Sequence, residues 1–197
     1  MNPYRILIAE DDSILLNQLK NLLIGVGYDV DTAANGKEAL DLWENSIYDV
    51  ILLDLAMPDV NGREVLNTVK NEQPFTQIIV VSGQGEKEDL IDAVNAHIYK
   101  YIEKGQDLLE EILTSVEEAI RNRHPVLLSL ESMVKKGENE PFLLSGNQSY
   151  TPKKLYDEVR KNTSFGKQYF KTFEESLIEY IPVDESIDDQ LGIKGVI

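Results

Sequence analysis

Apolar runs and amphipathic stretches alternate along the first 123 residues of this 197-residue chain. Short apolar runs predict buried strands, and stretches with apolar residues at helical spacing predict helices. The predicted strands are 5–9, 28–33, 50–53, 77–81 and 98–102. The predicted helices are 13–24, 37–45, 63–71, 86–95 and 107–123. Five successive strand–helix units predict an α/β fold, a five-stranded doubly wound parallel sheet with helices on both faces.

The alternation stops at His124-Pro125, and a different pattern follows. Further helices are predicted at 126–136, at 153–161 after the capping hydroxyl of Thr151, and from Thr163 or Ser164 to Ile181. A short apolar piece lies at 142–144. The lone histidines, His97 and His124, are predicted to be solvated. We therefore expect three parts, which are a first domain at 1–124, a small mainly helical module at 125–182 and an acidic tail at 183–197.

Acidic side chains follow two of the predicted strands. Glu10 and Asp11 come directly after the first strand, and Asp54 comes directly after the third. Lys104 stands just past the last strand. Because the carboxyl ends of parallel strands share one edge of the sheet, these four residues are expected to converge there. Three clustered carboxylates repel one another, and oxygen ligands without sulfur or imidazole favour Mg²⁺ or a similar hard cation.

Composition narrows the function further. The net charge is −16, and residues 1–124 hold 10 basic against 23 acidic residues, so binding to nucleic acid is not expected. Cysteine is absent, which excludes disulfide and thiolate chemistry and fits a cytoplasmic location. No apolar run approaches the ~20 residues of a membrane helix, so no membrane association is expected.

The acidic site resembles the receiver domain of two-component response regulators over about residues 4–123. The resemblance rests on the stretches ILIAEDD at 6–12, LDLAMPDVNG at 53–62, VSG at 81–83 and YIEK at 101–104. The second stretch matches the family signature D-x-x-M-P-x-x-x-G around the phosphoacceptor. The four motifs occur in the family's order and spacing, which is far more specific than any one of them alone.

This resemblance implies a role for each site residue. Asp54 would be the phosphoacceptor, since a carboxylate can attack a phosphoryl group. Mg²⁺ would be held by Asp11 and Asp54, by Glu10 through water, and by the backbone carbonyl of Ala56. Lys104 would pair with a phosphoryl oxygen.

Two further residues would form the switch. Ser82 would hydrogen-bond the phosphoryl group, and Tyr101, a half-buried strand aromatic, would respond to it. Asp12 should point away from Asp11 on an extended chain, so we interpret it as an exposed or helix-capping acid. Outside this context, the acidic triplet would be read as a helix start, Asp54 as a turn residue and Ser82 as a loop hydroxyl.

The chain departs from the family pattern at two places. Gly105 stands where the family has proline after the lysine, and a non-proline peptide strongly prefers the trans form, so the loop before the last helix is expected to differ. The bulky Ile98 stands near the start of the fifth strand. Both departures affect the surface formed by 86–95, 98–102 and 107–123, through which the family signals and through which a homodimer is expected.

The expected function is that of a response regulator that accepts a phosphoryl group on Asp54 from a sensor histidine kinase or phosphotransfer protein. It would switch a protein-interaction module and bind a downstream protein through residues 125–197, without enzymatic turnover. One alternative is a transcriptional regulator with an atypical DNA-binding effector. Another is a phosphohydrolase with an aspartate nucleophile, but the second aspartate that such enzymes need is replaced by Ala56.

Overall fold

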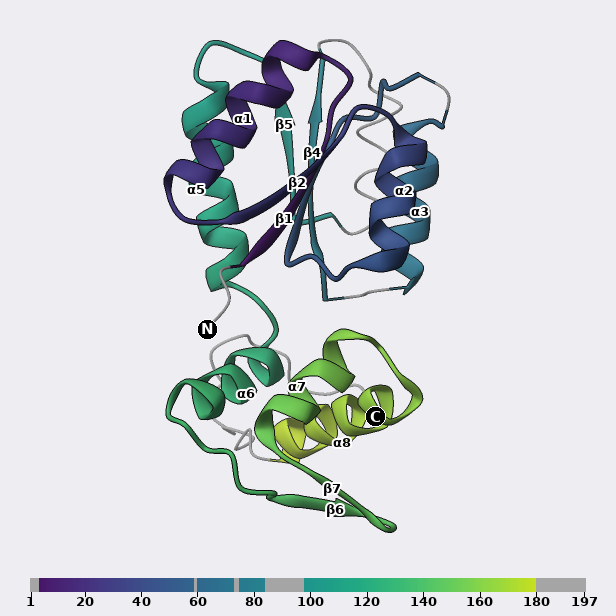
Figure 1. The fold of residues 1–197 in the computed structure, drawn as a ribbon, viewed down its shortest axis with the longest axis vertical. Helices are drawn as coiled ribbons and strands as arrows, with labels where there is room; N and C mark the ends of the chain where they lie inside the picture. The colour runs from purple at the N-terminus through teal and green to yellow at the C-terminus, as the bar shows by residue number, and fades with distance from the viewer. Residues whose placement is uncertain (1–3, 59, 73–74, 84–97, 180–197) are drawn as a thin grey trace, which may run out of the picture.

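The computed structural model describes residues 4–58, 60–72, 75–83 and 98–179. A sheet with helices on both faces stands above a smaller helical module (Figure 1). The strands of the sheet are β1 (Arg5–Ala9), β2 (Asp29–Ala33), β3 (Val50–Leu53), β4 (Gln77–Ser82) and β5 (Lys100–Glu103). They lie in the order β2-β1-β3-β4-β5 and pair in parallel, which confirms the predicted doubly wound sheet.

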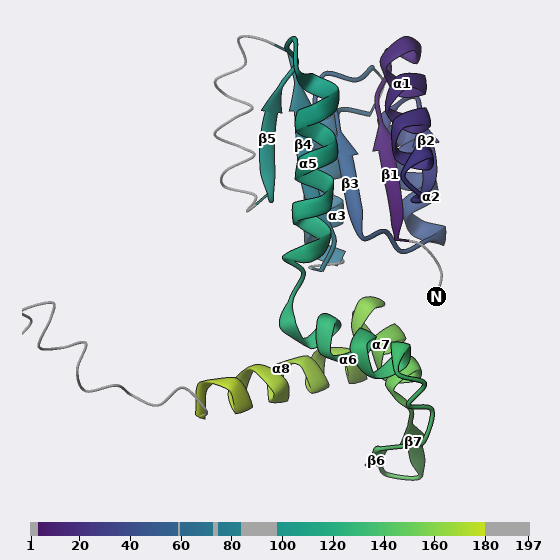
Figure 2. The same ribbon diagram turned by 90° about the vertical axis from the view of Figure 1, so that its left-hand side faces the viewer.

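The helices of this domain cover the sheet in two layers (Figures 1 and 2). They are α1 (Ser13–Gly25), α2 (Gly36–Asn45), α3 (Gly62–Glu72) and α5 (Leu108–Arg121). Alternate residues of a strand face opposite sides, so Ile6 and Ile8 pack in the core beneath α1 and α5. Leu7 and Ala9 pack on the other side, where Trp43 of α2 is also buried. Burial on both faces explains why these strands are continuous apolar runs.

The pairing register aligns the carboxyl ends of the strands. Ala9 of β1 lies opposite Ala33 of β2 and Leu53 of β3, and Leu53 lies opposite Val80 of β4. Ser82, the last residue of β4, lies opposite Glu103 of β5. The residues that follow these strands therefore emerge along one edge of the sheet.

Side-chain caps fix where the first two helices begin. The Asp12 carboxylate accepts hydrogen bonds from the backbone N–H groups of Ile14 and Leu15 at 2.8 and 3.3 Å. Asn35 caps α2 in the same way through the N–H of Glu38. These caps satisfy helix N–H groups that have no partner within the helix. The expectation that Asp12 is an exposed, helix-capping acid is thus confirmed.

The rest of the described chain forms a module with its own small core. Its elements are α6 (Pro125–Lys135), β6 (Leu143–Ser145), β7 (Gln148–Tyr150), α7 (Pro152–Arg160) and α8 (Ser164–Glu179). Leu130, Tyr150 and Leu155 are buried in this core, and Phe165 and Phe173 of α8 pack against it. The aromatic stripe of the last helix is therefore a packing face.

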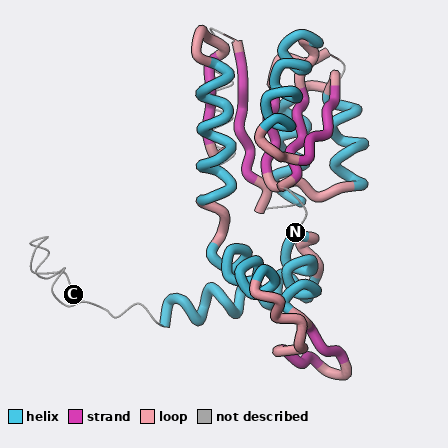
Figure 3. The backbone as a smooth tube through the Cα atoms, turned by 60° about the vertical axis from the view of Figure 1, so that its left-hand side comes forward, coloured by secondary structure: helices cyan, strands magenta, loops and turns pink. Residues whose placement is uncertain are grey.

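A small hairpin was not apparent from the sequence pattern, which showed only an apolar piece at 142–144. β6 and β7 pair antiparallel, with Leu143 opposite Tyr150, and the short loop between them begins at Gly146 with φ of 58°. Two strands of three residues are too short for a period of two to stand out. Figure 3 shows the hairpin projecting from the helices.

His124 lies at the joint between the sheet domain and the module, and the prediction that it is solvated is wrong. Its Nδ1 accepts a hydrogen bond from the backbone N–H of Val126 at 3.3 Å, so it caps α6. Its ring makes edge contacts with Phe75 and Phe170, at centroid distances of 6.0 and 4.6 Å. Burial lowers the pKa of His124 despite the nearby Glu174 carboxylate.

Some expectations fall on residues that the structure does not describe. These are the helix at 86–95, the environment of His97, the end of the last helix at Ile181 and the acidic tail at 183–197. Among the helices of the described residues, none combines the length and the apolar character that crossing a bilayer requires.

Gly62 allows α3 to start directly against the backbone at the end of β3. A methyl group on Gly62 would lie 2.2 Å from the carbonyl oxygen of Asp54. We predict that Gly62→Ala lowers the free energy of unfolding by about 1–3 kcal/mol, measured by chemical denaturation. Gly25→Ala is the matched control, because nothing lies within 4 Å of the added carbon. Equal denaturation midpoints for the two variants would contradict the prediction.

Candidate functional site

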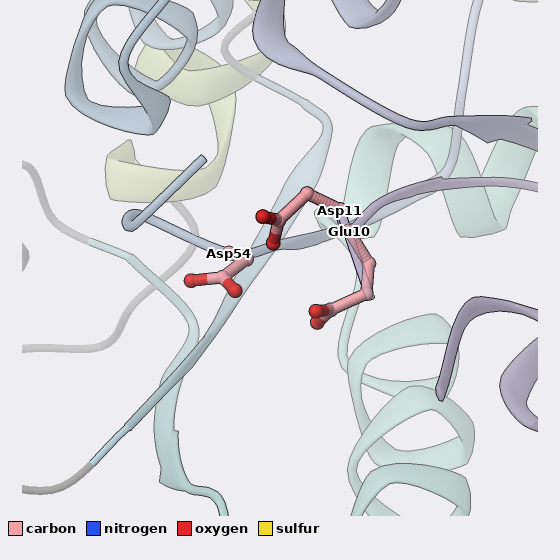
Figure 4. Close-up of side chains that lie close together, drawn as sticks. All are labelled: Glu10, Asp11 and Asp54. Atoms are coloured by element: carbon pink, nitrogen blue, oxygen red, sulfur yellow. The ribbon is translucent and has the colours of Figure 1, made fainter. Parts of the chain in front are cut away.

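Three carboxylates meet at the edge of the sheet where the strands end. Glu10 follows β1, Asp11 is the next residue, and Asp54 follows β3. Each residue offers one carboxylate oxygen, and these three oxygens all lie within 4.8 Å of one another. Figure 4 shows the three side chains converging. Glu10 and Asp54 are buried, with residue exposures of 2% and 3%, whereas Asp11 is exposed. The convergence predicted from the strand ends is therefore present.

Backbone hydrogen bonds hold the two buried acids in place. The N–H of Asp54 donates to the carbonyl of Ala9 at 2.9 Å, and the N–H of Glu10 donates to the carbonyl of Ala33 at 3.1 Å. These bonds continue the strand ladders one residue beyond β1 and β3. One oxygen of Asp54 also accepts the backbone N–H of Ala56 at 2.9 Å. The site is thus built on the rigid end of the sheet.

Lys104 supplies the positive charge that partly offsets the buried acids. Its Nζ lies 2.6 Å from Asp54 Oδ2 and 2.9 Å from Glu10 Oε1. Its backbone N–H donates to the carbonyl of Ser82 at 2.8 Å, which ties the lysine to the end of β4. A compact ammonium can bridge two carboxylates because it carries three donors on one atom.

The pKa shifts follow from burial and from this bridge. Burial raises the pKa of Glu10; the hydrogen bond from Lys104 lowers it, and the charge of Asp54 raises it further. Burial alone would lower the pKa of Lys104, but its hydrogen bonds and charge interactions with Asp54 and Glu10 raise it overall. The lysine therefore stays protonated over the physiological range.

The two predicted switch residues lie on neighbouring strands. Ser82 ends β4 and is completely buried. Tyr101 of β5 lies opposite Val80 and is partly buried against the core on the α2 and α3 side, as expected for a half-buried strand aromatic. Their roles as switch residues stay predictions.

The donor set fits a hard cation. The three acids offer only oxygen ligands, and two of them are buried beside a single lysine. Asp12 does not belong to this cluster, because its carboxylate caps α1 and its backbone N–H donates to Glu10 at 3.2 Å. Mg²⁺ is the hard cation expected from the sequence, and Ala56 as a carbonyl ligand stays a prediction.

Two structural features were not foreseen from the sequence. One is the hydrogen bond that Glu10 accepts directly from Lys104, while the role of Glu10 in holding Mg²⁺ through water stays a prediction. Gly62 belongs to the quoted signature, but its position against the Asp54 carbonyl was not foreseen. An isolated glycine in a sequence does not reveal which backbone atoms will approach it.

Comparisons with known proteins agree with this geometry. A family model described as the response regulator receiver domain matches residues 6–117. The cell cycle response regulator CtrA of Brucella anthropi is 27% identical over 173 residues, which cover 84% of this chain and 75% of the relative. CtrA of Brucella ovis matches with the same identity and coverage.

Solved structures match the sheet domain. A CheY-like receiver domain protein from Methanospirillum hungatei is 34% identical, with a TM-score of 0.55, over 60% of this chain and 98% of that chain. The response regulator protein TrrA of Thermotoga maritima, solved in complex with Mg(2+)-BeF, is 28% identical, with a TM-score of 0.54, over 59% of this chain and 98% of that chain.

The family match covers more than half of the chain and includes every acid of the cluster and Lys104. It spans the sheet of β1–β5, and the strand order and the acidic edge described above are present within it. The chain therefore belongs to the response regulator receiver family of two-component signalling proteins.

Proposed function

We propose that Asp54 accepts a phosphoryl group from a sensor histidine kinase or a phosphotransfer protein. The observation that carries this proposal is the contact of 2.6 Å between Lys104 and Asp54 within a cluster of carboxylates at the strand ends. Asp54 is held in place by the backbone of Ala9 and Ala56, so its carboxylate is oriented before the phosphoryl donor arrives. Such preorganisation favours phosphoryl transfer, which depends mainly on positioning and charge neutralisation.

In this proposal a carboxylate oxygen of Asp54 attacks phosphorus, the bond to the donor nitrogen breaks, and a mixed anhydride forms. Lys104 then exchanges its hydrogen bond with Asp54 for one with a phosphoryl oxygen. Glu10, Asp11, Asp54 and the carbonyl of Ala56 would hold Mg²⁺, which neutralises charge on the transferring group when bound. The three carboxylates face one another in the structure, and this supports a shared cation.

Ser82 and Tyr101 would carry the response. Ser82 lies at the buried end of β4, and Lys104 is tied to its backbone carbonyl, so a group bound at Lys104 is close to Ser82. If the Ser82 hydroxyl turns toward the phosphoryl oxygens, Tyr101 on the next strand can move inward. The surface formed by the predicted helix 86–95, β5 and α5 would then change, and this surface is also the proposed homodimer face.

We propose that the module of α6, α7, α8 and the hairpin is the output element that binds a downstream protein. Residues 125–197 hold 9 basic and 12 acidic residues, which favours a protein partner over nucleic acid. An atypical DNA-binding effector is the second candidate, and the match to CtrA over 173 residues extends beyond the receiver domain. Family membership and Ala56 both argue against the phosphohydrolase alternative. We also propose that the protein is located in the cytoplasm.

The first test of the proposal concerns the acceptor. Incubation with Mg²⁺ and acetyl phosphate should add the mass of one phosphoryl group to the intact protein, and Asp54→Asn should abolish that addition because the amide is not a nucleophile. Asp12→Asn is the control, since asparagine also caps helices and Asp12 lies outside the cluster. Phosphorylation of the Asp54 variant at the wild-type level would refute the assignment.

The second test concerns the metal. We predict that Asp11→Asn weakens Mg²⁺ binding by at least about tenfold, because even residues that only orient metal ligands are worth that much. Asp12→Asn should leave the affinity nearly unchanged. Isothermal titration calorimetry of both variants measures the difference. Equal losses in the two variants, or a larger loss for Asp12→Asn, would show that the ligand is assigned wrongly.

The third test concerns the response. Beryllofluoride with Mg²⁺ mimics the bound phosphoryl group and should change amide hydrogen exchange at 82–104 and also within 125–179. Ser82→Ala should weaken both changes together, because a ligand shifts an equilibrium only through its differential affinity for the two states. If exchange changes only beside Asp54, the module is not an output element of the receiver.

A further inference from the structure

A second cluster of buried charges lies at the other edge of the sheet, where the strands begin. Asp49 precedes β3, Arg123 follows α5, and Glu131 lies on α6; their exposures are 4%, 2% and 3%. The cluster lies between the sheet and the module, which sits beneath the amino ends of the strands (Figures 1 and 2). Phosphoryl transfer at Asp54 uses none of these residues.

Arg123 is the centre of this cluster. Its Nη1 lies 3.1 Å from Asp49 Oδ1, and its Nη2 pairs with Glu131. Nη1 also donates to the hydroxyl of Tyr156 on α7 at 3.3 Å, and the guanidinium lies over the ring of Tyr4, 4.5 Å from its centroid. One side chain from the short joint between α5 and α6 thus contacts the sheet domain and two helices of the module.

The partners of Arg123 are themselves satisfied from both parts of the chain. Glu131 accepts a hydrogen bond from the hydroxyl of Tyr4 at 2.8 Å and pairs with Lys135 at 2.7 Å. Nη2 of Arg160 on α7 lies 3.0 Å from Asp49 Oδ1. The two groups form an ion pair at this distance, but Nη2 does not donate a hydrogen bond. Asp49 therefore receives cations from both α7 and the joint.

The pKa shifts agree with this pairing. Burial would raise the pKa of Glu131, but the hydrogen bonds from Lys135 and Tyr4 and the charge of Arg123 lower it. Burial would lower the pKa of Arg123, but the charge of Asp49 and the other acids and phenols raises it. Arg123 and Glu131 are therefore both charged at neutral pH.

A second set of contacts supports the same orientation. The side-chain amide of Asn162, between α7 and α8, donates to the carbonyl of Glu72 at the end of α3, at 2.8 Å. Phe75, just before β4, packs edge to face on Phe170 of α8, with a centroid distance of 4.8 Å. One set of contacts involves residues that precede β1 and β3, and the other involves the end of α3 and the residue Phe75 before β4, so together they prevent rotation about a single point of attachment.

We propose that Arg123 is a latch that holds the module on the receiver in one orientation, whether or not Asp54 is modified. A hinge motion at the joint would separate Arg123 from Asp49 or from Glu131 and leave buried charges without partners, which strongly disfavours the open form. The phosphoryl site lies at the opposite edge of the sheet, so a partner that docks at Asp54 does not meet the module.

The latch changes how the output can work. Activation would alter the surfaces of a single rigid body, in which α5 leads directly into the joint, and would not release a tethered module. The face of the module that points away from the receiver is then always available to a partner. That face includes the hairpin, where Phe142 is 46% exposed and Leu144 is 76% exposed. This inference does not depend on phosphoryl transfer.

The test measures the orientation directly in the full-length protein. The chain has no cysteine, so Asn21→Cys on α1 and Lys167→Cys on α8, both at exposed positions, give two unique sites for spin labels. Pulsed electron–electron double resonance then measures the distribution of distances between the two spin labels, one on the receiver and one on the module. The labelled protein without further substitutions should give one narrow peak in the distance distribution, with and without beryllofluoride and Mg²⁺.

Two variants break the latch and one matched variant leaves it intact. Arg123→Met removes the central charge, and Asp49→Asn weakens its attachment to the sheet. Arg121→Met makes the same chemical change at an exposed position two residues away. The first two variants should broaden the peak or add a second one, while Arg121→Met should match the parent protein. A far-ultraviolet circular dichroism spectrum that matches the parent protein shows that each variant is folded.

Each outcome decides the matter. A narrow, unchanged peak in both Arg123→Met and Asp49→Asn overturns the latch, as does equal broadening in Arg121→Met. If Arg123→Met does not fold, Asp49→Asn alone decides. A broad distance distribution in the untreated parent protein also overturns the latch. If beryllofluoride broadens the distribution of the parent protein, the module is released on activation, and this result contradicts the latch as well. If amide hydrogen exchange at 82–104 does not respond to beryllofluoride, this result counts against the proposed function. The comparison of the variants without beryllofluoride still tests the latch.

Discussion

The ion pairs of Lys104 with two buried carboxylates are the interaction on which this site depends. Glu10 and Asp54 are almost completely buried, and a buried carboxylate is costly unless it is paired. Lys104 bridges both, but Asp11 adds a third acid, so among the described residues of the site three carboxyl groups face one lysine. In the proposed function, this imbalance favours binding of a cation at the edge of the sheet and, with the cation, of a phosphoryl group.

The charges at the opposite edge of the sheet follow the same electrostatic rule with a different result. There, Arg123, Arg160 and Lys135 face Asp49 and Glu131, so no negative charge is left without a partner. Because the acids of this cluster are paired with basic side chains of the same chain, the cluster does not need a ligand. The ion pairs instead hold together the segments that carry these side chains. In the two proposals, the receiver thus uses buried charge for chemistry at one end of its strands and for attachment at the other.

The position of the module gives this arrangement its functional meaning. The solved receiver domains that resemble this chain cover about 60% of it, which corresponds to the sheet domain. The module packs on the amino ends of the strands and leaves the acidic edge uncovered (Figure 1). The proposed modification of Asp54 and the proposed recognition by the module would therefore occur on separate surfaces, connected through the sheet and α5.

The sequence by itself determined the parallel sheet and the acidic site, because buried strands are continuous apolar runs and parallel strand ends must converge at Glu10, Asp54 and Lys104. It also placed Asp12 as a helix cap, since adjacent residues of an extended chain point apart. Only the tertiary structure decided the latch and the environment of His124. Arg123 and Asp49 lie 74 positions apart, and no local pattern distinguishes a charge that will be buried against a distant element from one that stays in water.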